Sequence, residues 1–187
     1  MVKLSRCNSF KDRYNFINEF DKNPVNALKV YYRYFPEIVA LRGLIQSPVY
    51  HPEGDVYTHT ESMLAMNRLP MLWFKLAILL HDIGKPVAYE LIDDKPRFYG
   101  HENFSAQMVP NIMKKFWMPE KDIMLVQWLV QNHMVFLNIN NYGRKNQLKL
   151  FSHPYFPYLL ELHRLDCLGS NGKFDICPAF FKIFSIF

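Results

Sequence analysis

The chain has 187 residues, enough for one domain with a sizeable core, and half of them are hydrophobic. That content, with 16% aromatic residues, excludes a disordered chain, and a net charge of +5 is too small an excess to identify a partner. Cys7, Cys167 and Cys177 form no CxxC pair, the first segment has no apolar signal-peptide core, and no apolar run approaches 18 residues. We therefore expect a cytoplasmic protein without membrane spans or disulfides.

Apolar residues recur at three- and four-residue spacing along most of the chain, which predicts helices. Proline and glycine mark the breaks, as at Asn23-Pro24 and at Gly84 with Pro86. We expect helices over residues 8–22, 25–34, 37–43, 56–67, 71–82, 102–116, 120–132, 144–151, 155–168 and 178–186. Strands do not alternate with helices, so the predicted fold class is all-α.

Residues 87–100 (VAYELIDDKPRFYG) have an extended pattern, which predicts either a small β-hairpin or a long loop with a turn at Asp93-Asp94. No linker or repeat divides the chain, so we expect a single domain over 1–187. Its parts are N-terminal helices over 1–35, a motif-bearing core over 36–172 and a C-terminal helix over 173–187. The apolar ending CPAFFKIFSIF needs a covering surface, from this chain's core, a second protomer or a region beyond it.

The stretch KLAILLHDIGKP, residues 75–86, ends an apolar run in His81-Asp82. Burying two ionisable groups is expensive unless something pairs with them. An imidazole nitrogen and a carboxylate oxygen together suit a divalent metal such as Mn, Fe, Ni or Zn. Such a site needs further donors from other helices. The candidates are His59, His101, His133 and Asp166.

The order of His59, then His81-Asp82 within HDIGK, then Asp166 resembles the HD-domain metal-dependent phosphohydrolase superfamily. More narrowly, five segments resemble the HD domain found in one branch of CCA-adding tRNA nucleotidyltransferases. They are YHPEGDVYTHT, LLHDIGKP, FYGHE, VQNHM and LDCLGSNG, and they extend from about residue 36 to residue 172.

The resemblance implies a helical bundle around a divalent cation such as Mn, Ni, Fe, Zn or Mg. The implied ligands are His59, His81, Asp82 and Asp166. For His101 and His133 two readings stay open: they ligate a second ion, or they contact substrate phosphate or donate protons. One or two ions are therefore expected.

Three differences from related proteins narrow the range of activities that we expect. Lys85 stands where the HDxxE pattern has a glutamate, so it would clamp phosphate or orient a general acid; the alternative is a solvated lysine at a helix end. No GYP motif follows His133, which argues against a cyclic-di-GMP phosphodiesterase. No glycine-serine turn with a DxD pair precedes residue 36, so nucleotide addition is not expected.

These features predict a phosphohydrolase or phosphodiesterase that uses a metal-activated water on a nucleotide or RNA end, for example a 2′,3′-cyclic phosphate or a 2′-phosphate. Its expected catalytic residues are Asp82, Lys85, His101 and His133. The alternative is a non-catalytic helical module that binds tRNA or a nucleotide and keeps a structural metal.

Residues beside the expected ligands are candidates for substrate binding. They are His51, Lys85, Asn132 and Arg164. His51 precedes Glu53 and Asp55 in the loop before the first ligand helix, where capping is the simpler role for Asp55. For Arg164 the alternative is a side chain on a solvated helix face. Glu102 could orient the imidazole of His101. We expect structural roles for His153 and His163.

Overall fold

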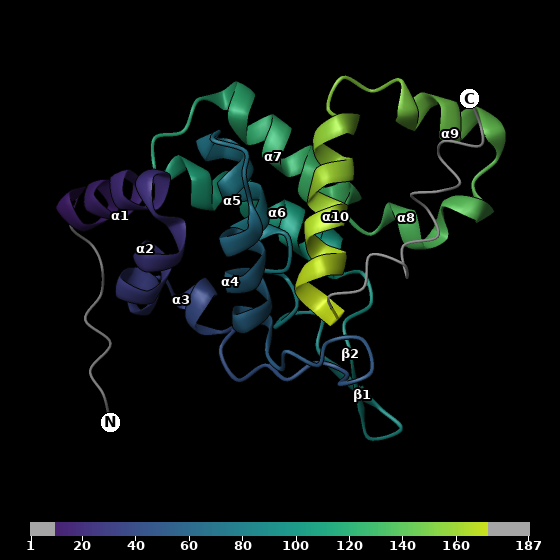
Figure 1. Ribbon diagram of the computed structural model, residues 1–187, viewed down its shortest axis with the longest axis horizontal. Coiled ribbons are helices and arrows are strands. Elements are labelled where there is room, and N and C mark those ends of the chain that lie inside the picture. Colours follow the sequence, from purple (N-terminus) through teal and green to yellow (C-terminus); the bar gives the residue numbers. More distant parts are fainter. Residues whose placement is uncertain (1–9, 172–187) are drawn as a thin grey trace.

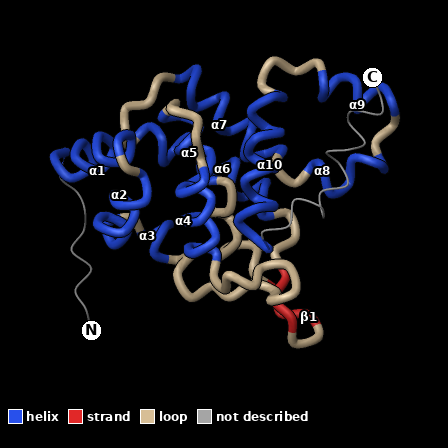
Figure 2. Tube along the Cα trace, in the orientation of Figure 1, coloured by secondary structure: helices blue, strands red, loops and turns tan. Residues whose placement is uncertain are grey.

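The computed structural model describes residues 10–171, and all of its regular structure is helical apart from one hairpin (Figures 1 and 2). The elements are α1 (Phe10–Lys22), α2 (Pro24–Tyr31), η1 (Tyr32–Tyr34), α3 (Pro36–Val39), α4 (Val56–Met66), α5 (Leu72–Leu80), β1 (Glu90–Ile92), β2 (Lys95–Arg97), α6 (His101–Lys114), α7 (Glu120–Asn132), α8 (Val135–Asn138), η2 (Ile139–Asn141), α9 (Arg144–Phe151) and α10 (Phe156–Asn171). The all-α prediction is confirmed, and the helix expected over 178–186 lies outside the described residues.

Helix α5 forms the centre of the core. Every residue from Phe74 to Leu80 is buried, because α4, α7 and α10 all pack against this helix. Its one charged residue, Lys75, pairs with Asp21 of α1 at 2.9 Å between Nζ and Oδ1. Figure 1 shows α4, α5 and α10 side by side, which brings segments far apart in the sequence to one end of α5.

Side chains at the helix starts explain where α2 and α4 begin. The Asn23 side chain accepts from the Asn26 amide, and Pro24 fits the first turn of α2 because its missing N–H is not needed there. Asp55 caps α4: its Oδ1 accepts from the Thr58 amide at 2.7 Å. Its Oδ2 accepts from the Gly43 amide at 2.7 Å, which ties the preceding loop to the same cap.

The extended segment after α5 forms the predicted small hairpin. Strands β1 and β2 pair antiparallel with Glu90 opposite Arg97. Asp93 and Asp94 connect the strands with φ of 50° and 56°. A two-residue turn with both φ values positive matches the twist of the strands, and aspartate tolerates this conformation better than most residues.

Two details differ from the sequence-based expectation. Helix α5 ends at Leu80, so His81 and Asp82 lie at the cap and in the following turn rather than inside the helix. Residues 135–141 form the short elements α8 and η2, which were not predicted. Their asparagines and β-branched residues give little helical signal, and burial of Val135, Phe136 and Ile139 supplies the stabilisation instead.

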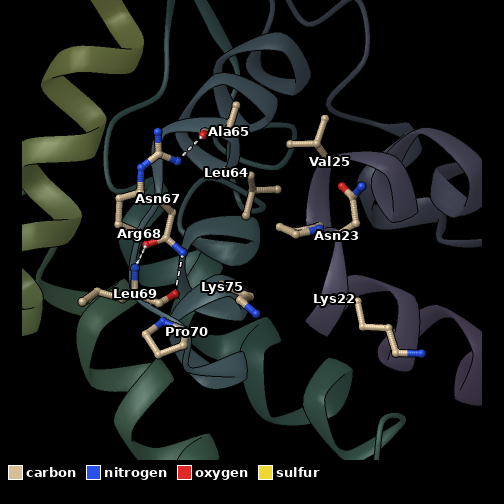
Figure 3. A pocket seen from close by; sticks show the side chains of 11 residues that line it. Lys22, Asn23, Val25, Leu64, Ala65, Asn67, Arg68, Leu69, Pro70 and Lys75 are labelled. Carbon is tan, nitrogen blue, oxygen red and sulfur yellow. Dashed lines mark hydrogen bonds between the residues drawn. The ribbon is translucent and has the colours of Figure 1, made fainter.

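A cleft of about 330 Å³ lies between the α1–α2 corner and the turn that joins α4 to α5 (Figure 3). None of the predicted site residues lines it. In Figure 3 the Asn67 amide bonds both the N–H and the carbonyl of Leu69, at 3.0 and 2.9 Å, and so closes the turn. The Asn67 side chain therefore has a structural contact in this cleft. None of the helices in the described part of the chain is both long and apolar enough to cross a membrane.

Candidate metal centre

The HD pair lies at the carboxyl end of α5. His81 Nδ1 donates to the Ile78 carbonyl at 2.8 Å, one of the carbonyls that a helix end leaves without an amide partner. Because a carbonyl oxygen only accepts, Nδ1 carries the hydrogen and Nε2 is left with its lone pair. His81 Nε2 is buried and has no hydrogen-bond partner among residues 10–171, and it lies 3.1 Å from Asp82 Oδ2.

Three further buried histidines are held in the same way, each through Nδ1. His101 donates to the Phe98 carbonyl at 2.8 Å, and His133 donates to the Val130 carbonyl at 2.7 Å. His59 of α4 has a carboxylate there instead, with Glu53 Oε1 at 2.8 Å. In each ring the other nitrogen, Nε2, faces a carboxylate: the partly buried Asp166 for His59 and the buried Asp82 for the others. A histidine that anchors one nitrogen and presents the other is the usual arrangement of a metal ligand.

The first group of potential ligands, centre A, consists of His59, His81 and Asp166. It joins α4, the end of α5 and α10, and its ligand atoms all lie within 4.8 Å of one another. His59 Nε2 is fully buried and lies 3.0 Å from Asp166 Oδ1. Two buried imidazole nitrogens that converge on a carboxylate fit a divalent cation, because imidazole and carboxylate groups are the ligands that such a cation binds.

The second group, centre B, consists of Asp82, His101 and His133, and all three are buried. Asp82 Oδ1 lies 3.0 Å from His101 Nε2 and 3.7 Å from His133 Nε2. The two Nε2 atoms are only 3.1 Å apart. Both rings use the hydrogen on Nδ1 for a carbonyl, so the two Nε2 atoms and a carboxylate oxygen converge here, and they repel unless a proton or a cation lies between them. The residues therefore fit a cation in centre B as well.

Electrostatics in this region favour charged carboxylates. Burial opposes charge on Asp82, but favourable interactions with His81 and with the Lys85 ammonium outweigh it and hold the pKa of the carboxyl well below its usual value. Burial lowers the pKa of His133, which keeps that ring neutral at pH 7. Burial also disfavours charge on His59, but Asp166 and Glu53 outweigh it and raise its pKa to about 9. A cation entering centre A would displace this proton.

Two glycines let the helices approach closely enough to assemble the centres. A Cβ on Gly84 would lie 2.5 Å from the Ser105 amide nitrogen and 2.6 Å from the His101 carbonyl oxygen. The Gly84 amide donates to Ser105 Oγ at 2.8 Å, which fixes the start of α6 beside the HD turn. On α10, a Cβ on Gly169 would lie 3.2 Å from Cε1 of His59.

Lys85 lies inside the site. Its side chain is buried, and its Nζ donates to Asp82 Oδ2 at 2.7 Å and to Gln46 Oε1 at 2.6 Å. The ammonium also lies 5.6 Å from the centre of the Phe98 ring. The alternative of a solvated lysine at a helix end is therefore wrong.

The other predicted binding residues lie at different distances from the centres. His51 Nδ1 shares Glu53 Oε1 with His59, at 2.9 Å, so it lies beside centre A. Asn132 donates to the Trp128 carbonyl and lines a cleft of about 110 Å³ next to His133. Arg164 differs: both of its bonded nitrogens contact Glu161 at 2.7 Å, so its guanidinium is already paired.

The remaining polar residues near the motifs have structural contacts. His153 stacks on Trp128 with ring centres 3.9 Å apart, and His163 stacks on Phe136. Glu102 Oε2 is 3.9 Å from His101 Nδ1, whose hydrogen goes to Phe98 instead. The Phe98 carbonyl thus orients His101, in place of Glu102.

Two residues of the site were not predicted as members of it. Glu53 orients His59, and its place six residues earlier in HPEGDVYTHT was the available signal. Gln46 contacts Lys85 from the loop before α4. Nothing in the local sequence indicates that role, because it depends on the fold of the loop.

Residues 55–166, more than half of the chain, match the HD domain family, so the chain belongs to that family. Curated relatives agree with the predicted resemblance. They include the multifunctional CCA protein of Pseudomonas fluorescens Pf-5, 38% identical over 89 residues, which are 46% of this chain and 21% of that protein. The A-adding tRNA nucleotidyltransferase of Deinococcus radiodurans is 33% identical over 146 residues, which are 73% of this chain and 32% of that protein.

The chain thus spans about a fifth to a third of the length of these curated relatives, which also include the multifunctional CCA protein of Halorhodospira halophila, where it covers 25%. What it shares with them is the HD region. An HD domain with two His/Asp groups able to hold metal ions is consistent with a phosphohydrolase.

Proposed function

We propose that the protein is a metal-dependent phosphohydrolase or phosphodiesterase acting on a phosphate ester of a nucleotide or an RNA end. One observation carries the proposal: four buried imidazoles turn Nε2 toward two carboxylates, with the Lys85 ammonium beside them. A purely structural metal site would be closed by its ligands and would need no buried lysine.

We infer one divalent cation in each centre. The two oxygens of Asp82 support this inference, because Oδ1 faces His101 while Oδ2 faces His81. His101 and His133 then serve as ligands rather than as proton donors. Bound cations would lower the pKa of a coordinated water and neutralise the charge of a phosphoryl group.

The chain's own residues contribute positioning and charge. His59, His81 and Asp166 would hold one ion, and the anchored Nδ1 atoms keep the rings from turning away. Lys85 has three N–H donors, of which two are used by Asp82 and Gln46. The third would bind a phosphoryl oxygen and stabilise the charge that develops on it during displacement.

The substrate class rests on the relatives, whose names refer to CCA and to tRNA. A 2′,3′-cyclic phosphate or a 2′-phosphate at a nucleotide or RNA end fits this class. His51, near centre A, and Asn132, near centre B, are our candidates for contacts to the rest of the substrate.

The test uses the full chain, stripped with EDTA and reloaded with Mn²⁺, Ni²⁺, Zn²⁺ or Mg²⁺. We expect turnover of bis-p-nitrophenyl phosphate, 2′,3′-cyclic AMP or 2′-AMP with at least one metal. Asp82→Ala should lose at least about 100-fold in kcat/KM, since Asp82 contacts both centres. Its helical circular dichroism should be retained, and His153→Ala should keep full turnover.

Turnover in EDTA, or undiminished turnover in Asp82→Ala, would overturn the proposal. The tRNA in the name of the D. radiodurans relative supports one alternative, a non-catalytic module that binds tRNA and keeps a structural metal. Retarded migration of tRNA in a gel, without turnover under any metal, would favour that alternative.

A further inference from the structure

Gln46, in the loop between α3 and α4, is buried, and only the oxygen of its side-chain amide has a partner among the described residues. It is 1% exposed, whereas its neighbour Ile45 is 59% exposed. Adjacent side chains of extended backbone point to opposite sides. The loop has therefore turned an amide inward and an isoleucine outward, the reverse of the usual preference.

The backbone of the loop fixes this choice. Ile45 pairs with Asp55 in an antiparallel bridge, and the Gln46 amide donates to the Gly54 carbonyl at 3.1 Å. Asp55 is also the cap of α4, so the loop is anchored to the helix that bears His59. Gln46 is thus held at one place relative to the metal ligands.

The orientation of the amide follows from its contact with Lys85. An ammonium only donates, so the atom 2.6 Å from Lys85 Nζ is the oxygen Oε1. The nitrogen Nε2 is the other end of the same amide group. It is buried and has no hydrogen-bond partner among the described residues. Two N–H donors next to a cation therefore lack an acceptor, which is costly unless something supplies one.

The acceptor that this corner of the site favours is an anionic oxygen. Lys85 Nζ has one N–H left after Asp82 and Gln46, and Gln46 Nε2 has two. The oxygens of Asp82 already face Lys85, His81 and His101. We propose that Gln46 Nε2 and Lys85 Nζ form a donor pair that binds a non-bridging phosphoryl oxygen of the substrate beside Asp82. The proposal rests on the function proposed above and assigns Gln46 to it.

One neighbouring group offers a competing explanation. Glu53 Oε2 is also buried without a partner, and Glu53 lies next to Gly54, which the Gln46 backbone contacts. If the Gln46 amide served only Glu53, its removal would disturb His59 and metal binding. If it serves phosphate, its removal would leave metal binding intact. The two roles therefore predict different measurements.

The experiment measures binding of inorganic phosphate to the Mn²⁺-loaded full chain by calorimetry. Gln46→Met keeps the length of the side chain but removes both donors, and we expect phosphate affinity to fall about 10-fold. Mn²⁺ affinity should stay within about 2-fold, which is the scatter of an unperturbed site. Gln147→Met, a control on α9 whose amide donates to the Ile139 carbonyl, should bind phosphate like the wild type.

Gln46→Glu covers the case in which Gln46→Met fails to fold. The carboxylate retains an acceptor for Lys85 but replaces the two donors with negative charge. We expect it to fold and to lose phosphate affinity more severely than Gln46→Met, with circular dichroism and a thermal melt as checks.

Several results would overturn the subsite. They are wild-type phosphate affinity in both variants, a parallel loss of Mn²⁺ affinity, or no phosphate binding by the wild type. These outcomes are separate from failure of the proposed function. A wild type that binds phosphate through Gln46 but hydrolyses no ester would refute the hydrolase and leave the subsite standing. Hydrolysis with unchanged phosphate binding in both Gln46 variants would support the hydrolase and refute the subsite.

Discussion

At the scale of single residues, the centre depends on how each imidazole is anchored. His81, His101 and His133 each donate Nδ1–H to the carbonyl three residues earlier, at 2.7 to 2.8 Å. The same short contact fixes the tautomer three times and leaves Nε2 available each time. His59 differs, because its Nδ1 contacts the Glu53 carboxylate from the preceding loop. Glu53 is therefore the one anchor of these four rings that a side-chain substitution can remove.

We predict that Glu53→Ala weakens Mn²⁺ binding about 10- to 100-fold, the usual cost of losing a group that orients a metal-bound histidine. Glu53→Gln should lie between this variant and the wild type, because its amide oxygen can still accept from Nδ1. Calorimetric titration measures the effect. Glu61→Gln on α4, which removes a surface ion pair with Lys29, is the matched control and should bind normally. Wild-type affinity in Glu53→Ala would show that His59 needs no anchor.

At the scale of elements, the proposed metal ligands meet because the HD turn and α6 touch without a side chain between them. Gly84 occupies that contact, with the Ser105 backbone nitrogen and the His101 carbonyl oxygen where a Cβ would be. Backbone atoms cannot swing aside as a flexible side chain can, so any larger residue must move α6. Such a shift would carry His101 away from Asp82.

We predict that Gly84→Ala lowers the melting temperature by roughly 2–12 °C, from an overpacking cost of about 1–3 kcal/mol in a chain of this size. It should also weaken metal binding, since the start of α6 bears a ligand of centre B. A thermal melt with calorimetric metal titration measures both. Gly143→Ala, where a Cβ would meet nothing within 4 Å, should leave both unchanged. An unaltered melt in Gly84→Ala would contradict the close packing.

Local signals in the sequence predict much of the fold and of the candidate site. Periodicity with Asn23-Pro24, Gly84 and Pro86 predicted most helix positions, and Asp93-Asp94 predicted the turn of the hairpin. The HD motif and its ordered partners indicated the residues that the fold brings together. The burial of Gln46 was not predictable, because it depends on a bridge between Ile45 and Asp55 across the loop. The pairing of Arg164 with Glu161 likewise depends on rotamers that spacing alone leaves open.

At the scale of the whole molecule, the two centres connect distant parts of the chain. Their ligands come from α4, the turn after α5, the start of α6, the end of α7 and α10. Figure 1 shows the loop before α4 and the hairpin at the same end of the molecule. A cation in either centre would bind side chains that only the folded chain brings together. Metal binding should therefore stabilise the entire fold.

We predict that Mn²⁺ at 100 times its dissociation constant raises the melting temperature of the EDTA-treated protein by roughly 5–10 °C. Excess EDTA should reverse the shift. In Asp82→Ala the shift should fall to a small fraction of this value, because one carboxylate facing both centres is gone. Differential scanning fluorimetry measures these shifts. A wild type whose melting temperature ignores divalent cations would contradict the link between metal and fold.

The central claim is that His59, His81, Asp82, His101, His133 and Asp166 form a two-cation centre. The most direct measurement is anomalous diffraction at the manganese edge from crystals of the full chain grown with Mn²⁺. We expect two peaks, one bounded by His59, His81 and Asp166 and one bounded by Asp82, His101 and His133. A map without a peak among these residues would contradict the account.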